Sequence, residues 1–529
     1  FYRLNIRLPS GLLSGNGNQY GDFDECLSIN SAVRGKYCLA SLQINLAEMG
    51  HKNLDYLIHS GHYIRSNITD MGHRVPRYSS LLWGVCIPSS CSSFDLEEEL
   101  SHKLSDLGVT VRVQNTMCTV KHVQRPYSFG KSLAMYVAFF LGILLLITLG
   151  TIFDDDKEGV TNFEKLLNAF SLKRNLRKVF DLSDSPTRVK GIDAIRGMNA
   201  FALLMAHKSM AMAHNPYVNK ASYVFGMPWA VIGRSAIVYT DSFLYLSGFL
   251  NAHNLLQDLE RKGTIDLKSR LLSRWFRLFP LFLSLMLFCT YILPDLNNGP
   301  QWNLVVEEHS RVCEKNMWKS FLFIHNYFGF EEMCLTHTHQ LGIDMQLYVA
   351  TFPLMLILWR FRRTGLALIV GIAVGSTVLR VLATHWYDIT LIEGFLYFCW
   401  SVAVFTIVSP YKMGLEGYRY EHFPAAMFAA FAPILWGLFM SIAHWAICND
   451  YAGIGTSFVE SRVFKFFNKI AYSVYLTQFP IFFYNVGVQR HAEYYSPFLL
   501  VSTHRKIHCS IYPNNKLIYR DNKLLAILN

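Results

Sequence analysis

One apolar segment carries side chains that could do acid–base chemistry. Residues 191–210, GIDAIRGMNAFALLMAHKSM, are hydrophobic enough to cross a membrane, yet they include Asp193, Arg196 and His207. Eleven residues make close to three helical turns, so Arg196 and His207 project from one face, about 16 Å apart along the axis. Asp193 can pair with Arg196 at a spacing of three. Histidine takes and returns a proton near neutral pH, as a general base must.

A plainer interpretation stays open for each of these residues. An Asp193–Arg196 ion pair at the membrane interface would fix the depth of the helix. His207 could serve only as a hydrogen-bonding group between helices. An ionisable group inside a span is nevertheless a functional hypothesis by default.

Two further apolar segments each contain one carboxylate. Asp241 lies in YTDSFLYLSGFL, residues 239–250, and Asp344 lies in HTHQLGIDMQLYVATFPLM, residues 337–355. A lone aspartate in a span needs a partner, and we expect a His or Arg of another span to supply it for Asp344. We predict that one of the two carboxylates orients either His207 or the molecule that His207 deprotonates.

A basic stripe precedes the next apolar segment. Arg274 and Arg277 share a helix face in RLLSRWFRLFPLF, where arginine forks would suit the recognition of phosphate at the cytosolic mouth. Anchoring of the span by the positive-inside rule is the other interpretation. His337 and His339 lack a clear third ligand, so we expect no metal site.

The composition predicts an α-helical polytopic membrane protein. The 529 residues are 52% hydrophobic and 16% charged, against about 25% charged in a soluble domain, and the mean hydropathy is +0.21. The net charge of +11 comes mostly from short loops between apolar runs, as the positive-inside rule requires. With no nucleic-acid-binding motif, we expect no nucleic-acid partner. We expect nine to ten spans, of which nine are visible, near residues 133–153, 195–213, 236–252, 278–296, 342–359, 366–383, 391–408, 425–447 and 470–488.

The chain divides into four predicted parts. Residues 1–130 look like an N-terminally truncated extracellular or lumenal domain, with five cysteines and a glycosylation sequon at Asn67. Residues 131–190 hold the first span and a basic cytosolic linker, residues 191–490 a multi-span domain, and residues 499–529 an atypical polar tail. The odd cysteine count means one free thiol or a partner upstream of the first residue, and we favour the second. The candidate disulfide cysteines are Cys26, Cys38, Cys86, Cys91, Cys118, Cys313 and Cys334.

The basic loops also predict an orientation in a plasma membrane or endomembrane. With the N-terminal domain outside, each basic cluster falls on the cytosolic side of the membrane. The loop with Cys313 and Cys334 then falls outside, and Cys448 lies near that same face. If a span is missing from the region 380–395, the predicted topology inverts after residue 390.

These segments occur in an order that resembles the nose resistant to fluoxetine family, which carries a membrane-bound acyltransferase family three domain. The segments are GIDAIRGMNAFALLMAHKSM, TDSFLYLSGFL, SRWFRLFPLF, MWKSFLFIHNYF, MCLTHTHQLGIDMQLY and NKIAYSVYLTQFP, preceded by GDFDECLSI, GKYCLASL and WGVCIPSSCSS. The resemblance implies acyl transfer in a lipid membrane from a cytosolic donor, such as acyl-CoA as co-substrate, to a hydroxyl acceptor, with no bound cofactor. It maps the key histidine onto His207 and the donor-binding arginines onto Arg196, Arg274 and Arg277.

The sequence departs from the family pattern at four places, two of which are the region 380–395, which is shorter than usual, and the tail after Leu499, which does not continue the expected last helix. His339-Gln340 stands where members commonly have Trp-Tyr, and Thr477-Gln478 stands where many have a histidine. Two other function classes stay open. A transporter or lipid- or xenobiotic-handling protein could use the same polar cavity, and a receptor or adhesion module could use the disulfide domain.

Overall fold

The computed structural model describes most of the chain in separate stretches. They are residues 19–30, 33–44, 80–105, 109–121, 128–154, 161–183, 191–212, 215, 217, 236–329, 332–386, 422–449, 460–494 and 496. Asn67, the predicted span 391–408 and the tail 499–529 lie outside them.

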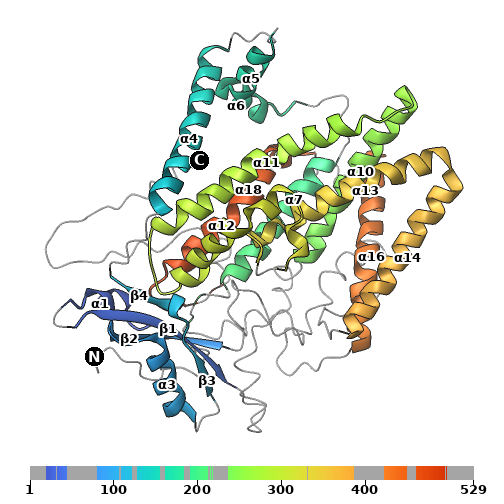
Figure 1. Cartoon of the computed structure of the whole chain (residues 1–529). Coiled ribbons are helices and arrows are strands. Elements are labelled where there is room, and N and C mark those ends of the chain that lie inside the picture. The colour runs from blue at the N-terminus through green and yellow to red at the C-terminus, as the bar shows by residue number, and fades with distance from the viewer. Residues whose placement is uncertain are drawn as a thin grey trace. The chain divides into compact units, whose positions relative to one another are not determined.

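The first part of the chain folds as a small antiparallel sheet with helices (Figure 1). The strand β1 (Gly35–Ile44) is central, and it pairs with β2 (Ser80–Pro88), β3 (Val109–Arg112) and β4 (Cys118–Val120). Alternate residues of β1, such as Cys38, Ala40 and Leu42, are buried in one apolar cluster, as expected of a strand with a covered face.

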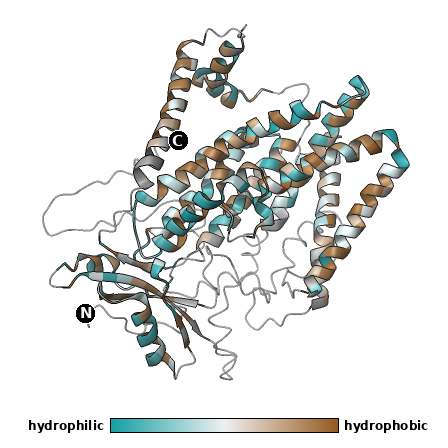
Figure 2. Cartoon of the chain, in the orientation of Figure 1, coloured by the Kyte–Doolittle hydropathy of each residue, from teal (hydrophilic) through white to brown (hydrophobic). Residues whose placement is uncertain are grey.

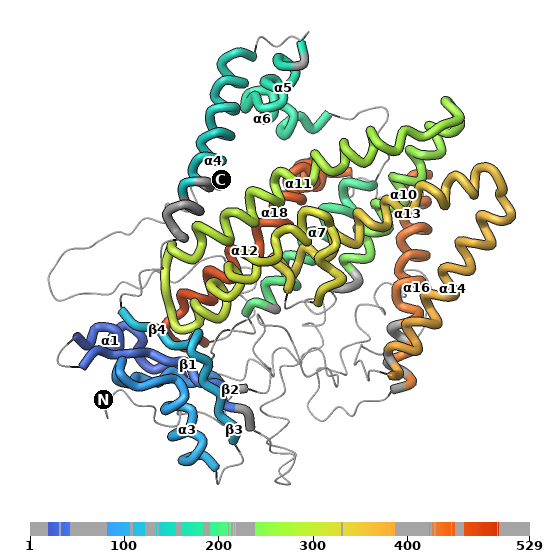
Figure 3. The backbone as a smooth tube through the Cα atoms, in the orientation of Figure 1, coloured from blue at the N-terminus to red at the C-terminus, as the bar shows by residue number. Residues whose placement is uncertain are grey.

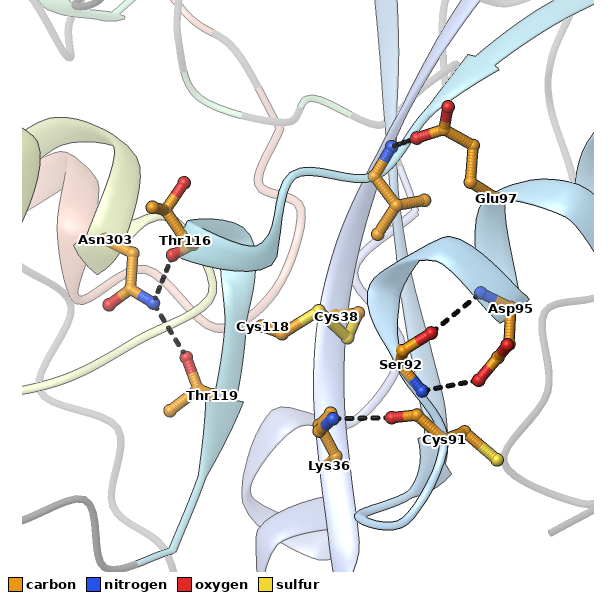
Figure 4. Close-up of a disulfide and its surroundings, with 11 residues drawn as sticks. Lys36, Cys38, Cys91, Ser92, Asp95, Glu97, Thr116, Cys118, Thr119 and Asn303 are labelled. Atoms are coloured by element: carbon orange, nitrogen blue, oxygen red, sulfur yellow. Dashed lines mark hydrogen bonds between the residues drawn. A yellow bond between two sulfur atoms is a disulfide. The ribbon is translucent and has the colours of Figure 1, made fainter.

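Two helices and two disulfides complete this domain. The helices are α1 (Phe23–Ser28) and α3 (Ser93–Leu104), and α3 begins with a reciprocal cap between Ser92 and Asp95 (Figure 4). The disulfides are Cys26–Cys86, which joins α1 to β2, and Cys38–Cys118, which joins β1 to β4 (Figure 4). Cys91, the fifth cysteine, carries a free thiol within the part of the chain that the structure describes.

Eight helices coincide with eight of the nine predicted segments. They are α4 (Ser128–Ile152), α7 (Ile192–Met212), α10 (Ala236–Lys262), α11 (Leu267–Tyr291), α13 (His339–Arg360), α14 (Arg362–Trp386), α16 (His422–Cys448) and α18 (Arg462–Gly487). Within the described residues, three stretches are long and apolar enough to cross a membrane, namely Leu267–Asp295, Thr336–Arg360 and Arg362–Ala383, and shorter apolar stretches lie in α4 and α16 (Figure 2). The total of nine to ten spans stays a prediction.

A helix that the sequence analysis did not predict packs beside α11. This helix, α12 (Glu308–Phe321), runs antiparallel to α11, since Ser310 donates to the carbonyl of Thr290 near the end of α11 and Phe321 packs on Phe279 farther back. The Cys313–Cys334 disulfide ties α12 to the segment before α13. Both cysteines belong to a buried apolar cluster that joins α11, α12, α13 and α18. Figure 3 shows the backbones of these four helices.

The helix directions correct the predicted topology of the second half. The amide of Gly191 donates to Glu460 at 2.6 Å, so α7 and α18 begin at the same end of the bundle and run parallel. Nine simple crossings in alternation would make them antiparallel. The structure therefore agrees with the inversion after residue 390, and we call the end where α7, α11 and α18 begin the basic end.

The direction of α16 supports this correction. Trp436 donates to Ser242 at 2.8 Å, and His444 packs on Phe249, so α16 runs parallel to α10. Its last turn reaches Gly191, because Ile447 would lie 2.9 Å from a Cβ added there. Cys448 consequently lies at the basic end, and its predicted place near the face of Cys313 and Cys334 is wrong.

Candidate active site

His207 lies in the interior of α7 with 9% of its surface exposed. Its ring meets Phe479 of α18 edge to face, with 4.8 Å between centroids, and the ring of His337 is 6.5 Å away. The side chain of Gln478 of α18 lies beside the imidazole. Nδ1 of His207 and Oε1 of Gln478 are both buried without a hydrogen-bond partner among the described residues.

His337 forms the second layer of this cluster. It comes from the short turn Thr336–Thr338 before α13, and its ring stacks on Phe479 at 4.2 Å with an interplanar angle of 5°. Tyr475 donates its hydroxyl to the carbonyl of His337 at 2.5 Å, and Nε2 of His337 lies 3.2 Å from the carbonyl of Leu476. These contacts lock His337 against one face of α18.

The segment that delivers His337 has a strained backbone. Phe323, which is buried just after α12, has a φ of 57°, a conformation that costs energy for a residue with a side chain. Gln346 of α13 holds the segment, because its Nε2 donates to the Phe323 carbonyl and to Oδ1 of Asn326, both at 2.8 Å. The strained backbone at Phe323 is thus held by Gln346.

Two residues with separate predicted roles form one ion pair. Arg274 of α11 makes a short salt bridge with Asp344 of α13, and about a quarter of each side chain is exposed. Arg274 also donates to Ser247 of α10 at 3.1 Å and lies over the ring of Tyr348 at 4.1 Å. The pair supplies the arginine partner that we expected for Asp344.

Asp193 and Arg196 share a third residue. Asn468 of α18 accepts from Arg196 at 3.0 Å through Oδ1, and its amide nitrogen donates to Asp193. Asp344 and Arg277 also interact electrostatically with Arg196, and Arg277 is exposed at the basic end. Arg196 is therefore held to α18 through Asn468.

Asp241 faces a different part of the bundle. Tyr239, two residues earlier on α10, packs against Leu203 and Ala206 of α7. Side chains two positions apart on a helix point to nearly opposite sides of it. The structure thus brings Arg274 to Asp344 and His207 to α18, and it places Asp241 on the side of α10 that faces away from α7.

The sequence analysis missed four residues of this cluster, His337, Tyr475, Gln478 and Phe479. His337 was weighed only as a metal ligand, and Gln478 only as a departure from the family pattern. Among the described residues, no three His, Cys, Asp or Glu side chains form a metal-binding group. The signal for Gln478 was its replacement of a histidine beside an otherwise matching motif.

Together, these features define a helical membrane-type bundle with buried histidines and arginines, preceded by a disulfide-bonded sheet domain. The chain belongs to the family of the acyltransferase domain, which it matches over residues 189–502. Residues 5–100 match the N-terminal domain of the nose resistant-to-fluoxetine proteins. These matches confirm the family resemblance.

One curated relative is nose resistant to fluoxetine protein 6 of Caenorhabditis elegans. It is 22% identical over 438 residues, which cover 72% of this chain and 52% of the relative. The chain therefore spans about half the length of that relative. No solved structure matches the chain.

Proposed function

We propose that this chain is an integral-membrane acyltransferase that moves an acyl group from a phosphate-bearing donor, acyl-CoA, to a hydroxyl acceptor. The acyltransferase domain supports the reaction class. One structural observation carries the site: His207 is buried, with Nδ1 unpartnered among the described residues, on the same helix as Arg196. A buried imidazole with spare hydrogen-bonding capacity suits a group that exchanges a proton.

Gln478 is proposed as the residue that positions His207. Its Oε1 is a buried acceptor without a described partner, and its Nε2 is already occupied because it donates to the Tyr475 carbonyl at 2.9 Å. A slight movement would let Oε1 accept a hydrogen bond from the Nδ1–H group of His207, which leaves the lone pair on Nε2 as the base. An oriented base with a fixed tautomer is the usual arrangement in acyl transfer.

The proposed reaction balances on His207 alone. Nε2 removes the proton from the acceptor hydroxyl while the oxygen attacks the thioester carbonyl. When the tetrahedral intermediate collapses, the carbon–sulfur bond breaks, and the imidazolium returns that proton to the leaving thiolate. The products are an ester and the free thiol.

The basic end would receive the donor. Arg277 is exposed there, and Arg196 lies within its electrostatic range. Guanidinium groups bind phosphate oxygens in a fork. Arg274 would stabilise this end through its salt bridge with Asp344. It would contact the donor only if that salt bridge breaks.

A positioning role for Gln478 predicts a shift in pH dependence. In Gln478→Glu, an ionised carboxylate would stabilise the protonated imidazole, so the acid limb of the rate profile would move to higher pH. Gln478→Leu should lower kcat by about 10-fold or more with little change in KM, because orientation acts on the transition state. Gln478→His, which supplies another polar ring, should restore part of the rate. A purely structural role would leave the pH profile of Gln478→Glu unchanged.

The fate of a doubly labelled acyl-CoA separates this function from transport. Protein reconstituted in vesicles should transfer the acyl label to a hydroxyl-bearing acceptor and leave the CoA label as free thiol. Movement of intact acyl-CoA, or of an acceptor lipid without ester formation, would instead support the transporter and contradict the acyltransferase.

A further inference from the structure

Two short helices follow the first apolar helix, and both carry exposed apolar side chains, of which the last, Phe180, stacks on Phe466 of α18. They are α5 (Asn162–Phe170) and α6 (Leu172–Phe180). Phe163 and Leu166 of α5 are 67% and 51% exposed, and Leu172 and Leu176 of α6 are 49% and 46% exposed. These pairs recur at spacings of three and four, so each lies along one side of its helix.

The helices are held firmly at the end of α4. Asp154, which is buried, accepts from Ser171 at 2.5 Å and forms a 2.6 Å salt bridge with Arg174. Gly150 of α4 packs directly on the backbone of α5, where an added Cβ would lie 2.4 Å from the Leu167 carbonyl. The exposed apolar side chains therefore have a fixed direction relative to α4.

The exposed side chains of α4 indicate the environment of the apolar side chains on α5 and α6. Leu141, Leu144 and Leu145 are each 58% exposed along its apolar length, and Ile152 and Phe153 continue the exposed apolar surface to the α5 junction (Figure 2). Such a surface is suited to lipid. The exposed side chains of α5 and α6 begin where this lipid-facing surface ends.

The charge of the two helices identifies the lipid class. Residues 162–180 contain five basic residues, one of which, Arg174, is paired with Asp154, and one acidic residue. Lys178 lies two positions from Leu176 and so on the opposite side of α6, and Lys165 is exposed on α5. Apolar residues on one face with lysine and arginine on the others are typical of helices that lie in an anionic membrane interface.

We propose that α5 and α6 dock on the anionic phospholipid surface that α4 enters, with Phe163, Leu166, Leu172 and Leu176 inserted below the headgroups. The docking would hold the linker before α7 at the membrane, next to the basic end, since Lys469 of α18 donates to the carbonyls of Lys178 and Asp181. This proposal does not depend on the acyltransferase reaction.

A single-cysteine fluorescence experiment on the full chain tests it. The five cysteines that do not belong to the three described disulfides, Cys91, Cys289, Cys399, Cys448 and Cys509, are replaced by serine. An environment-sensitive dye is then placed at Leu176→Cys or, as the matched control, at Lys178→Cys. The protein is reconstituted in phosphatidylcholine vesicles with or without phosphatidylserine.

The dye at position 176 should be quenched several-fold more by nitroxide-labelled lipid than by aqueous iodide, and phosphatidylserine should increase the difference. The dye at position 178 should show the opposite preference. Equal iodide quenching at both positions in both lipid mixtures would overturn the proposal. Lipid quenching at 176 that does not respond to phosphatidylserine would overturn its anionic part. Protection of 176 that appears only in native membranes would point to a protein partner instead.

Discussion

At the scale of single residues, the geometry separates side chains that the sequence treated alike. His207 and Arg196 lie on one face of α7, but their contacts Phe479 and Asn468 come from α18, more than 250 positions later in the chain. Asp344 pairs with Arg274, and Asp241 lies on the side of α10 that faces away from α7. Gln478 is thus better placed than either aspartate to orient the imidazole.

The Arg274–Asp344 pair predicts a pattern in stability. Arg274→Met would leave a partly buried carboxylate without its partner and should lower the free energy of unfolding by about 2 kcal/mol, less than for a fully buried pair because both groups retain some exposure. The double variant Arg274→Met/Asp344→Leu should recover most of the loss, since no charge remains unpaired. Thermal unfolding of the detergent-solubilised protein measures both. Equal losses in the single and double variants would show that the pair contributes no coupling.

Arg277 supplies the matched control for this test. It is exposed and one helical turn from Arg274, so Arg277→Met should leave the unfolding midpoint nearly unchanged. Under the proposed function, the same variant should raise the KM for acyl-CoA by about 10-fold, the value of one charge-assisted hydrogen bond. An unchanged KM would remove Arg277 from the donor site.

At the scale of elements, helix positions were predictable and helix directions were not. Hydropathy located eight of the described helices because a span must bury its backbone in about 20 apolar residues. The same pattern missed α12, since EHSRVCEKNMWKSF is too polar for that criterion, although it packs into the bundle and is tied by a disulfide. The parallel arrangement of α7 and α18 depends on tertiary contacts such as Gly191–Glu460, which leave no periodic signal in the sequence.

The Cys313–Cys334 disulfide should matter for the position of α12. The bond spans 21 residues, and a loop of that length corresponds to about 3 kcal/mol of stabilisation on the chain-entropy estimate. The double variant Cys313→Ser/Cys334→Ser should therefore unfold at a clearly lower temperature. Cys91→Ser, which removes a free thiol, should unfold like the parent chain. If both variants behave alike, the disulfide contributes nothing to stability.

Cysteine labelling can test the corrected helix directions. With the other non-disulfide cysteines replaced, an impermeant maleimide applied to sealed vesicles should label Cys448 and an introduced Thr264→Cys from the same side, because both lie at the basic end. Nine alternating spans would place these two positions on opposite sides of the membrane. Labelling from opposite sides would therefore contradict the parallel arrangement of α7 and α18.

At the scale of the whole molecule, the disulfide domain contacts the bundle at the end opposite the basic end. Asn303, just before α12, donates to Thr116 at 2.9 Å and Thr119 at 3.1 Å (Figure 4), and Arg490, just after α18, pairs with Asp24 at 3.1 Å. The cysteines and the basic loops of the sequence predicted that the disulfide domain and the basic loops lie on opposite sides of the membrane. It could not supply the contacts, because they join segments whose patterns are independent of one another.

The central claim is that His207 performs the proton transfer in acyl transfer, and the rate of that transfer tests it most directly. The purified protein in lipid nanodiscs, supplied with labelled acyl-CoA and membrane-lipid extract, should lose about 10²–10⁴-fold in rate on His207→Ala, the usual contribution of a general base. His253→Ala, a change at an exposed histidine of α10, should keep the parent rate. Full acyl transfer by the His207→Ala protein would contradict the account.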